Sequence, residues 1–397
     1  RTMAPEKRVF VVGAGPVGLV AAAHLIQSGI PVTLFEATAS VSQELRASTF
    51  HAPTMDMLDD LGLAKDLMAE GRVAPNMQYR SRAGVIAQFD FSCIADMTRH
   101  PFRLQAEQFK LNRIIHARLK DHPLFEIAFN KKVIGVTQDD ESVCVRFADG
   151  TERHGCWLIG ADGARSGVRR GLGIEFEGFT WPERFLVVST PYDFTKDFPD
   201  LSPVSYVADP VRWHFLLRVP GFWRAMFPLE PETDDATATS WDYAQTALRS
   251  IVPGIDEFEV GHVTLYRVHQ RVARTFRLHR ALLAGDAAHI NNPLGGMGMN
   301  GGIHDAVNLA GCLAKVWQGA APATELDRYV RQRRGVTIEH VEKATVENKR
   351  NLEARDPENQ KQFREKMRRI LADPADTRTY VMKLSMVASL HRAAEIQ

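Results

Sequence analysis

The sequence predicts an α/β fold in which a domain of parallel strands is interrupted by a mostly antiparallel sheet and followed by helices. Residues 8–36 show a strand, a glycine-rich turn, a helix and a second strand in succession. From Trp181 to about Arg267 the chain is rich in aromatic residues and prolines, with strand-like alternation. Beyond Leu326 it is highly charged and helical in pattern.

The first unit is a βαβ element. Arg8–Val12 is a short apolar run that enters the glycine turn, and Pro16–Gln27 repeats its apolar residues at helical spacing. Val32–Phe35 is a second buried strand, closed by Glu36. The unit spans about 30 residues, as expected for a βαβ motif.

The remaining elements continue this pattern and define four segments. We expect helices over 53–61 and 107–120, and strands near 132–136, 142–147, 153–159 and 281–284. The dipeptide Asp149-Gly150 predicts a hairpin turn. The predicted division is a nucleotide-binding domain over 3–180 and 276–325, an inserted sheet domain over 181–275, and C-terminal helices over 326–397.

Composition excludes several classes of partner. The formal net charge is +1, so there is no basic surplus for nucleic acid, and no apolar run reaches the roughly 18 residues of a membrane span. Four cysteines show no paired spacing, and no apolar signal segment is seen. We therefore expect reduced thiols, no metal site and a cytoplasmic protein.

The N-terminal turn predicts a dinucleotide site. Gly13, Ala14 and Gly15, with Gly18, form G-x-G-x-x-G after a strand and at the start of a helix. The first glycine permits the tight turn, the second lets the backbone approach a pyrophosphate, and the third allows close packing of helix and strand. Glu36 follows 18 residues later, where a carboxylate can bind ribose hydroxyls and disfavours a 2′-phosphate. The alternative is a glycine turn without a ligand.

A late segment indicates that the chain returns to the same ligand. Residues 285–289 read Gly-Asp-Ala-Ala-His, and residues 292–300 read Asn-Pro-Leu-Gly-Gly-Met-Gly-Met-Asn. Contacts some 270 residues apart favour a long ligand such as FAD, held at both ends. Three intermediate segments support FAD over NAD: those around Arg46, Gln105 and Asp162.

With these motifs the chain resembles the single-component FAD-dependent aromatic hydroxylases, the p-hydroxybenzoate hydroxylase-like flavoprotein monooxygenases, from about residue 8 to about residue 318. The order of motifs carries the resemblance: G-x-G-x-x-G, then D-G-x-x-S-x-x-R at 162–169, then G-D-A-A-H at 285–289 with a downstream proline and asparagine. The implied fold is a Rossmann-like FAD-binding domain with an inserted substrate sheet and C-terminal helices.

The resemblance also implies roles for individual residues. Arg46 and Gln105 would contact the pyrophosphate and ribityl region, Asp286 would hold a ribityl hydroxyl, and Asp162 would be a further cofactor contact. The backbone of Gly296, Gly298, Met299 and Asn300 would cradle the pyrimidine end of the flavin. A helix beginning near Asn300 would direct its positive end at the flavin N1–C2 carbonyl.

The implied reaction is hydroxylation of an electron-rich aromatic substrate, phenolic or a hydroxylated heterocycle. No second G-x-G-x-x-G is present, so NADH or NADPH would bind transiently to reduce FAD, which would then react with O2 through a flavin C4a-hydroperoxide. Candidate catalytic residues are Pro293, whose carbonyl could accept a bond from the substrate or which could merely shape its turn, and Tyr206 or Tyr192, which could polarise a phenol. Trp213, Phe215 and Arg224 are further candidates for lining the pocket.

Other functions remain open on this fold. A flavin-dependent halogenase or a polyprenyl reductase would share the first motif, although no Trp-x-Trp-x-Ile-Pro segment is found. A non-catalytic escort protein would be expected to lose the middle motif or the late glycines, and both are present. The last helices could form a lid or the surface of a homodimer.

Overall fold

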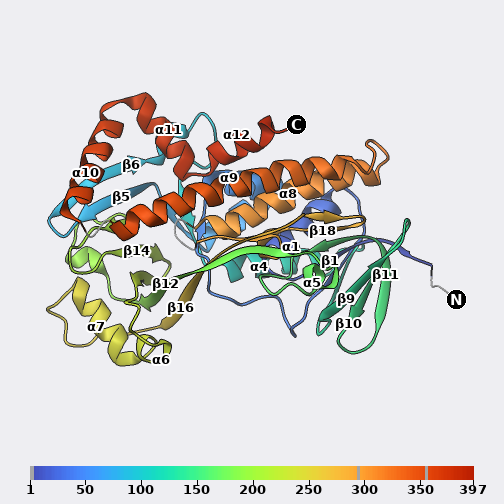
Figure 1. The fold of residues 1–397 in the computed structure, drawn as a ribbon, viewed down its shortest axis with the longest axis horizontal. Coiled ribbons are helices and arrows are strands. Elements are labelled where there is room, and N and C mark those ends of the chain that lie inside the picture. The colour runs from blue at the N-terminus through green and yellow to red at the C-terminus, as the bar shows by residue number, and fades with distance from the viewer. Residues whose placement is uncertain (1–3, 293–295, 354–355) are drawn as a thin grey trace.

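Two large sheets and a set of C-terminal helices make up the fold (Figure 1). The structure is a computed structural model that describes residues 4–292, 296–353 and 356–397. One sheet is mostly parallel and the other mostly antiparallel. The α/β fold class predicted from the sequence is confirmed.

The first sheet contains the predicted βαβ unit at its centre. Strand β1 lies between β11 and β2, and β8, β2, β1, β11 and β18 are parallel neighbours in that order. Helix α1 (Pro16–Gln27) follows β1 and has the predicted bounds. The strands of this sheet are β1 (Glu6–Val12), β2 (Val32–Phe35), β8 (Phe125–Ala128), β9 (Val133–Gln138), β10 (Val143–Phe147), β11 (Glu152–Gly160), β17 (Arg277–Leu278) and β18 (Ala281–Leu283).

Helices from distant parts of the sequence cover this sheet. Helix α1 packs against both α4 and α8, so the first and last segments of the domain share one core. A small sheet, in the order β3-β7-β4, lies beside it. These elements are α2 (Ala52–Asp60), α3 (Ala64–Ala69), α4 (Gln108–Leu119), α5 (Gly167–Gly171), α8 (Met297–Trp317), β3 (Thr49–Phe50), β4 (Arg72–Ala74), β7 (Arg103–Gln105) and the short turn η3 (Gly285–Ala287).

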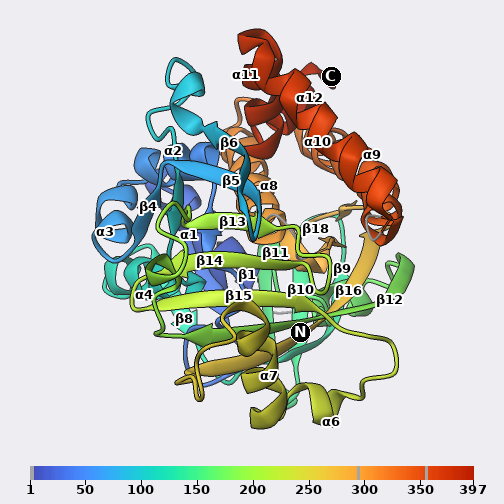
Figure 2. The same ribbon diagram turned by 90° about the vertical axis from the view of Figure 1, so that its left-hand side faces the viewer.

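The second sheet has the strand order β19-β16-β12-β15-β14-β13-β5-β6 (Figure 2). Some of its strands lie outside the predicted bounds of the sheet domain, 181–275. Strands β5 and β6 come from before the insertion, because β5 finds its partner in β13, more than 120 residues later. Its strands are β5 (Asn76–Ser81), β6 (Gly84–Asp90), β12 (Phe176–Thr190), β13 (Val204–Val207), β14 (His214–Val219), β15 (Phe222–Pro228), β16 (His262–Ala273) and β19 (His289–Ile290).

Helices cover both faces of the second sheet. One face packs against α7, a helix that the sequence analysis did not predict, and the other packs against the C-terminal helices, which lie over β5 and β6 in Figures 1 and 2. Across the described residues, no helix is long and apolar enough to span a membrane. The remaining elements are α6 (Asp235–Ala238), α7 (Trp241–Ile251), α9 (Glu325–Glu353), α10 (Pro357–Ala372), α11 (Pro374–Leu384), α12 (Val387–Glu395), η1 (Phe91–Ile94) and η2 (Phe194–Lys196).

Candidate active site

Three sequence motifs meet where neighbouring parallel strands end. Ala161 N donates to Val12 O at 2.8 Å, and Ala284 N donates to Gly160 O at 3.0 Å. Gly13 N donates to Phe35 O at 2.8 Å. The ends of β1, β2, β11 and β18 are therefore adjacent, which is where open α/β sheets bind their ligands.

The glycines of the N-terminal turn have distinct steric roles. A Cβ on Gly13 (φ +109°) would lie 2.2 Å from the Ala161 oxygen, and one on Gly18 would lie 2.0 Å from the Gly13 oxygen. A Cβ on Gly15 would meet no described heavy atom within 4 Å. Gly13 and Gly18 therefore allow the chain to fold on itself, whereas the open side of Gly15 leaves room for a ligand to approach the backbone.

The late motif packs directly on this turn. Gly285 (φ +63°) and Gly302 both lie against Val17, because a Cβ added to either glycine would lie 2.9 or 2.6 Å, respectively, from a methyl carbon of that valine. Glu36 fixes the turn from the other side, because its Oε1 accepts the N–H of Ala14 at 3.1 Å. Segments some 270 residues apart thus form one surface.

Asp162 and Arg169 of the middle motif anchor the loop that follows β11. Asp162 accepts from Ser166 Oγ and from Val168 N at 3.2 Å, and burial raises its pKa. Arg169 donates to Ala287 O at 2.9 Å and to Ala164 O at 2.7 Å. This arginine ties the middle motif to the late motif, a role that the sequence pattern alone did not reveal.

A buried charge cluster holds the late motif to the helices behind it. Asp305 of α8 contacts His289 Nε2 at 2.5 Å and accepts from Arg333 Nε at 2.6 Å and from Gly285 N at 3.1 Å. Burial alone would raise the pKa of Asp305, but His289 and Arg333 hold it at about 2. His289 therefore has a structural partner, which argues against a catalytic role.

A second group of predicted residues surrounds β3 and β7. Asn300 donates to Thr49 O at 2.8 Å and accepts from His51 N at 2.9 Å, which fixes the start of α8 against β3. Thr49 in turn pairs with Gln105 of β7. The side chain of Asn300 is therefore engaged by the protein itself, while the backbone N–H groups of Gly298 and Met299, in the first helical turn, have no acceptor within the helix.

Gln105 provides the fit test for a bound cofactor. Its side chain is fully buried, yet neither Oε1 nor Nε2 has a hydrogen-bond partner in the described structure. An unpartnered buried amide costs about 1–3 kcal/mol. A polar ligand at the position expected for the FAD ribityl chain would satisfy this amide, so the residues present fit the cofactor.

Arg46 lies in a loop that the second sheet holds in place. Arg224 of β15 donates to Ser48 Oγ at 2.7 Å and to Arg46 O at 3.3 Å, and Tyr266 OH donates to the same carbonyl at 3.0 Å. The Arg46 side chain is 61% exposed and pairs with Glu44. Arg224, a predicted pocket residue, is thus engaged in anchoring this loop.

Asp286 has no hydrogen-bond partner among the described residues. Burial raises its pKa, while the positive influence of His289 and Arg46 opposes that rise. Pro293, the candidate at the substrate border, lies outside the described residues.

The two candidate tyrosines lie on opposite faces of the second sheet. Tyr206 packs on the face covered by the C-terminal helices, where its ring stacks on Tyr79 at 5.3 Å between centroids and meets Phe215 edge to face at 3.9 Å. Tyr192 packs on the α7 face, where its hydrogen bond to Asp197 raises its pKa to about 12. The structure does not bring Tyr192 together with the other site residues.

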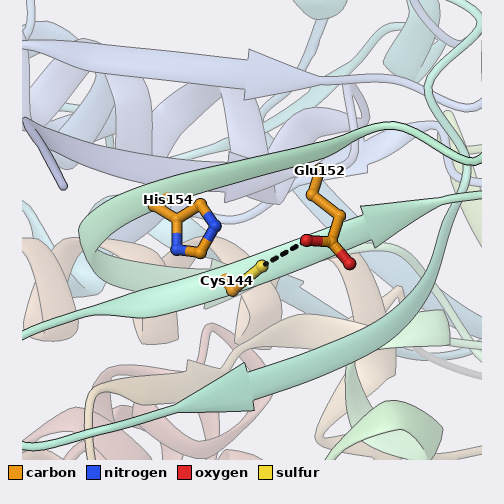
Figure 3. Close-up of side chains that lie close together, drawn as sticks. All are labelled: Cys144, Glu152 and His154. Atoms are coloured by element: carbon orange, nitrogen blue, oxygen red, sulfur yellow. Dashed lines mark hydrogen bonds between the residues drawn. The ribbon is translucent and has the colours of Figure 1, made fainter. Parts of the chain in front are cut away.

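A separate cluster of possible metal ligands lies on the β10–β11 hairpin (Figure 3). Cys144, Glu152 and His154 share one face because Cys144 pairs with His154 across the strands and Glu152 is two residues away. Their spacing matches no metal motif, so no pattern in the sequence pointed to them. His154 precedes Asp162 by eight residues of largely extended chain, roughly 26 Å, which separates this cluster from the candidate active site.

Comparison with known proteins agrees with this geometry. The family model described as FAD binding domain matches residues 6–344. The chain is 36% identical to a para-nitrophenol 4-monooxygenase of Pseudomonas sp. (strain WBC-3) over 88% of each chain. It is 33% identical to a 6-hydroxy-3-succinoylpyridine 3-monooxygenase of Pseudomonas putida, over 88% of this chain and 90% of that protein.

A solved structure gives the same result. The crystal structure of p-nitrophenol 4-monooxygenase from Pseudomonas putida DLL-E4 superposes with a TM-score of 0.88 at 32% identity, covering 96% of this chain and 98% of that one. The predicted family and cofactor are confirmed. The chain belongs to the FAD-dependent aromatic monooxygenases.

Proposed function

We propose that this monooxygenase uses NADH or NADPH and O2 to hydroxylate a small aromatic ring that already carries a hydroxyl group. The names of two relatives, para-nitrophenol 4-monooxygenase and 6-hydroxy-3-succinoylpyridine 3-monooxygenase, support a phenol or a hydroxypyridine with a second oxygen-bearing substituent as the substrate. Those names also favour hydroxylation over the halogenase, reductase and escort alternatives.

The observation that carries the cofactor site is the meeting of all three motifs beside the unpartnered amide of Gln105. Gly13, Ala14, Gly15 and Gly18 would take the pyrophosphate at the start of α1, and Glu36 the adenosine ribose. Bound FAD would supply hydride acceptance and oxygen activation.

The protein's own residues would position the ring of the flavin and that of the substrate. Gln105, Asp286, Arg46 and Asp162 would hold the ribityl and phosphate groups. The first turn of α8, from Gly296 to Asn300, would present free N–H groups and a positive dipole end to the flavin carbonyl. Pro293 would lie at the substrate border, as the resemblance implies.

The substrate would lie against the second sheet on its Tyr206 face. Tyr206, Tyr79 and Phe215 supply aromatic surface there, and the C-terminal helices cover that face. Such a covered site excludes water, which strengthens every polar contact inside it. Tyr206, rather than Tyr192, is therefore our candidate for contacting the substrate hydroxyl. A homodimer stays a prediction.

Turnover by the purified, FAD-loaded protein tests this function. NADH and NADPH oxidation should each be followed with a panel of 4-substituted phenols and hydroxypyridines, together with O2 uptake and product mass. At least one substrate should accelerate oxidation and yield a product heavier by one oxygen atom. Acceleration without any oxygenated product across the panel would contradict the proposal.

A further inference from the structure

Arg103 is a buried cation without a buried counter-charge. Its side chain is 3% exposed, and among the described residues only the Leu384 carbonyl accepts a hydrogen bond from it, at 3.1 Å from Nη2. Its Nε is buried and has no partner. No described carboxylate forms an ion pair with it, so the protein keeps a desolvated guanidinium that is only partly satisfied.

The other buried arginines have a counter-charge or several acceptors within the protein. Arg80 pairs with Asp200 at 2.8 Å, and Arg333 pairs with Asp305 at 2.6 Å. Arg169 donates to two carbonyls, and Arg224 contacts a hydroxyl and two carbonyls of the Arg46 loop. Arg103 therefore stands apart within the described structure, and its free donors need an acceptor from elsewhere.

The position of Arg103 connects the cofactor site to the second sheet. Arg103 and Gln105 alternate with Leu104 on β7, so their side chains project from the same face, roughly 7 Å apart along the strand. Leu104 points the other way, into the main core. Strand β7 also contacts β14 of the second sheet. The unpartnered amide of Gln105 and the only partly satisfied guanidinium of Arg103 thus border one region, which extends from the proposed ribityl contact toward the sheet.

An aromatic ring packs against the guanidinium. Phe91 lies 5.3 Å from it, measured from Cζ to the ring centre. Burial lowers the pKa of Arg103, and its electrostatic neighbours, the hydroxyls of Tyr206, Tyr79 and Tyr380, oppose that effect. A guanidinium beside an aromatic cluster is suited to an aromatic ring that carries a negatively charged oxygen group.

We infer that Arg103 is the specificity-determining residue that binds the anionic oxygen substituent of the aromatic substrate, as a phenolate or a ring carboxylate. The inference rests on the proposed function for the location of the substrate. It adds that the ligand is an anion and that β7, which carries the cofactor contact Gln105, also carries the substrate's counter-charge.

Binding to the FAD-loaded protein, without NADH or NADPH, tests this inference separately from turnover. The probes are two matched pairs: 4-hydroxybenzoate with 4-hydroxybenzamide, and 4-nitrophenolate with 4-nitroanisole, each titrated by the change in flavin absorbance. The wild-type protein should prefer the anion of at least one pair. Arg103→Met should weaken binding of that anion by about 10- to 100-fold, with little change for its neutral partner, because a charge-assisted hydrogen bond is lost.

Two further variants exclude a merely structural effect. Arg103→Lys keeps the charge and should retain part of the preference. Arg80→Met makes the same replacement at another buried arginine, on β5, whose ion-pair partner Asp200 is 55% exposed and so stays solvated when Arg80 is removed. This variant should keep the full preference for the anion. Because Arg103 is a buried cation without a counter-charge, Arg103→Met should leave the melting temperature unchanged or raise it.

Several outcomes would overturn the assignment. A wild-type protein that prefers neither anion would do so, as would an Arg103→Met variant that retains the preference. Equal loss for the charged and neutral members of a pair would identify a packing role instead. Absence of turnover with preserved, Arg103-dependent anion binding would reject the proposed reaction and leave the anion site standing.

Discussion

Replacing Gln105 with leucine is expected to stabilise the apoprotein while weakening its binding of FAD. The amide is fully buried, and neither of its polar atoms has a partner in the described structure. Leucine has a similar volume and no polar atom, so the substitution removes an unsatisfied group. The gain should be about 1–3 kcal/mol in the free energy of unfolding of the apoprotein.

The same amide should contribute to cofactor affinity. If FAD supplies the missing partners, two hydrogen bonds of about 0.5–1.5 kcal/mol each are lost in Gln105→Leu, and the dissociation constant should rise roughly 5- to 150-fold. For a chain of 397 residues the unfolding entropy is about 0.8 kcal/mol/K, so the apoprotein should melt about 1–4 °C higher. In saturating FAD this gain should shrink or reverse.

Gln245→Leu is the matched control. Gln245 of α7 is also buried, but its amide forms two 2.7 Å hydrogen bonds with the backbone of Phe258. Its loss leaves the Phe258 N–H and C=O unsatisfied and should destabilise the protein by about 2–5 kcal/mol without changing FAD affinity. Differential scanning fluorimetry of apo and loaded protein, with flavin fluorescence titration, measures both quantities.

The result that would refute the reasoning is a Gln105→Leu apoprotein that melts lower than wild type while FAD affinity stays the same. That pattern would mean that the amide is satisfied in solution by groups other than the cofactor. A fall in affinity for Gln245→Leu equal to that for Gln105→Leu would show that affinity follows general stability, and would equally contradict the assignment of Gln105.

Two further predictions follow from packing and burial. Gly302→Ala should destabilise the loaded protein by about 1–3 kcal/mol, because the new Cβ would lie 2.6 Å from Val17. In the same helix, a Cβ on Gly311 would meet no described atom within 4 Å, so Gly311→Ala should stabilise the protein by about 0.5–1 kcal/mol. Chemical unfolding measures both changes. Burial lowers the pKa of His304 to about 3 in the folded protein, whereas in the unfolded chain it is about 6.5. As the pH falls from about 6.5 toward 3, the unfolded state therefore binds a proton that the folded state does not, and the stability should decrease. In wild type, the free energy of unfolding should fall between pH values of about 7 and 5. In His304→Gln this fall should be about 2 kcal/mol smaller, and a fall of the same size in both proteins would contradict this.

Local sequence patterns determined the secondary structure of the N-terminal segment. The bounds of α1 and β2 match their prediction because apolar periodicity, glycine conformation and helix start signals act within a few residues. The order of the three motifs, in turn, was enough to indicate the family and FAD. The site residues taken from that resemblance remain predictions, although the structure brings most of them to one edge of the first sheet and to the neighbouring β3–β7 region.

Residues of the same type received different roles only from the tertiary structure. The sequence could not separate Arg103 from Arg224, because the distinction depends on acceptors contributed by remote loops. Tyr206 and Tyr192 differ through the face of the sheet to which each belongs, and that face is set by which helices cover it. Strand β5 joined the second sheet through a partner more than 120 residues away. Backbone conformation is largely local, whereas burial, pairing and charge compensation depend on contacts that the folded chain alone creates.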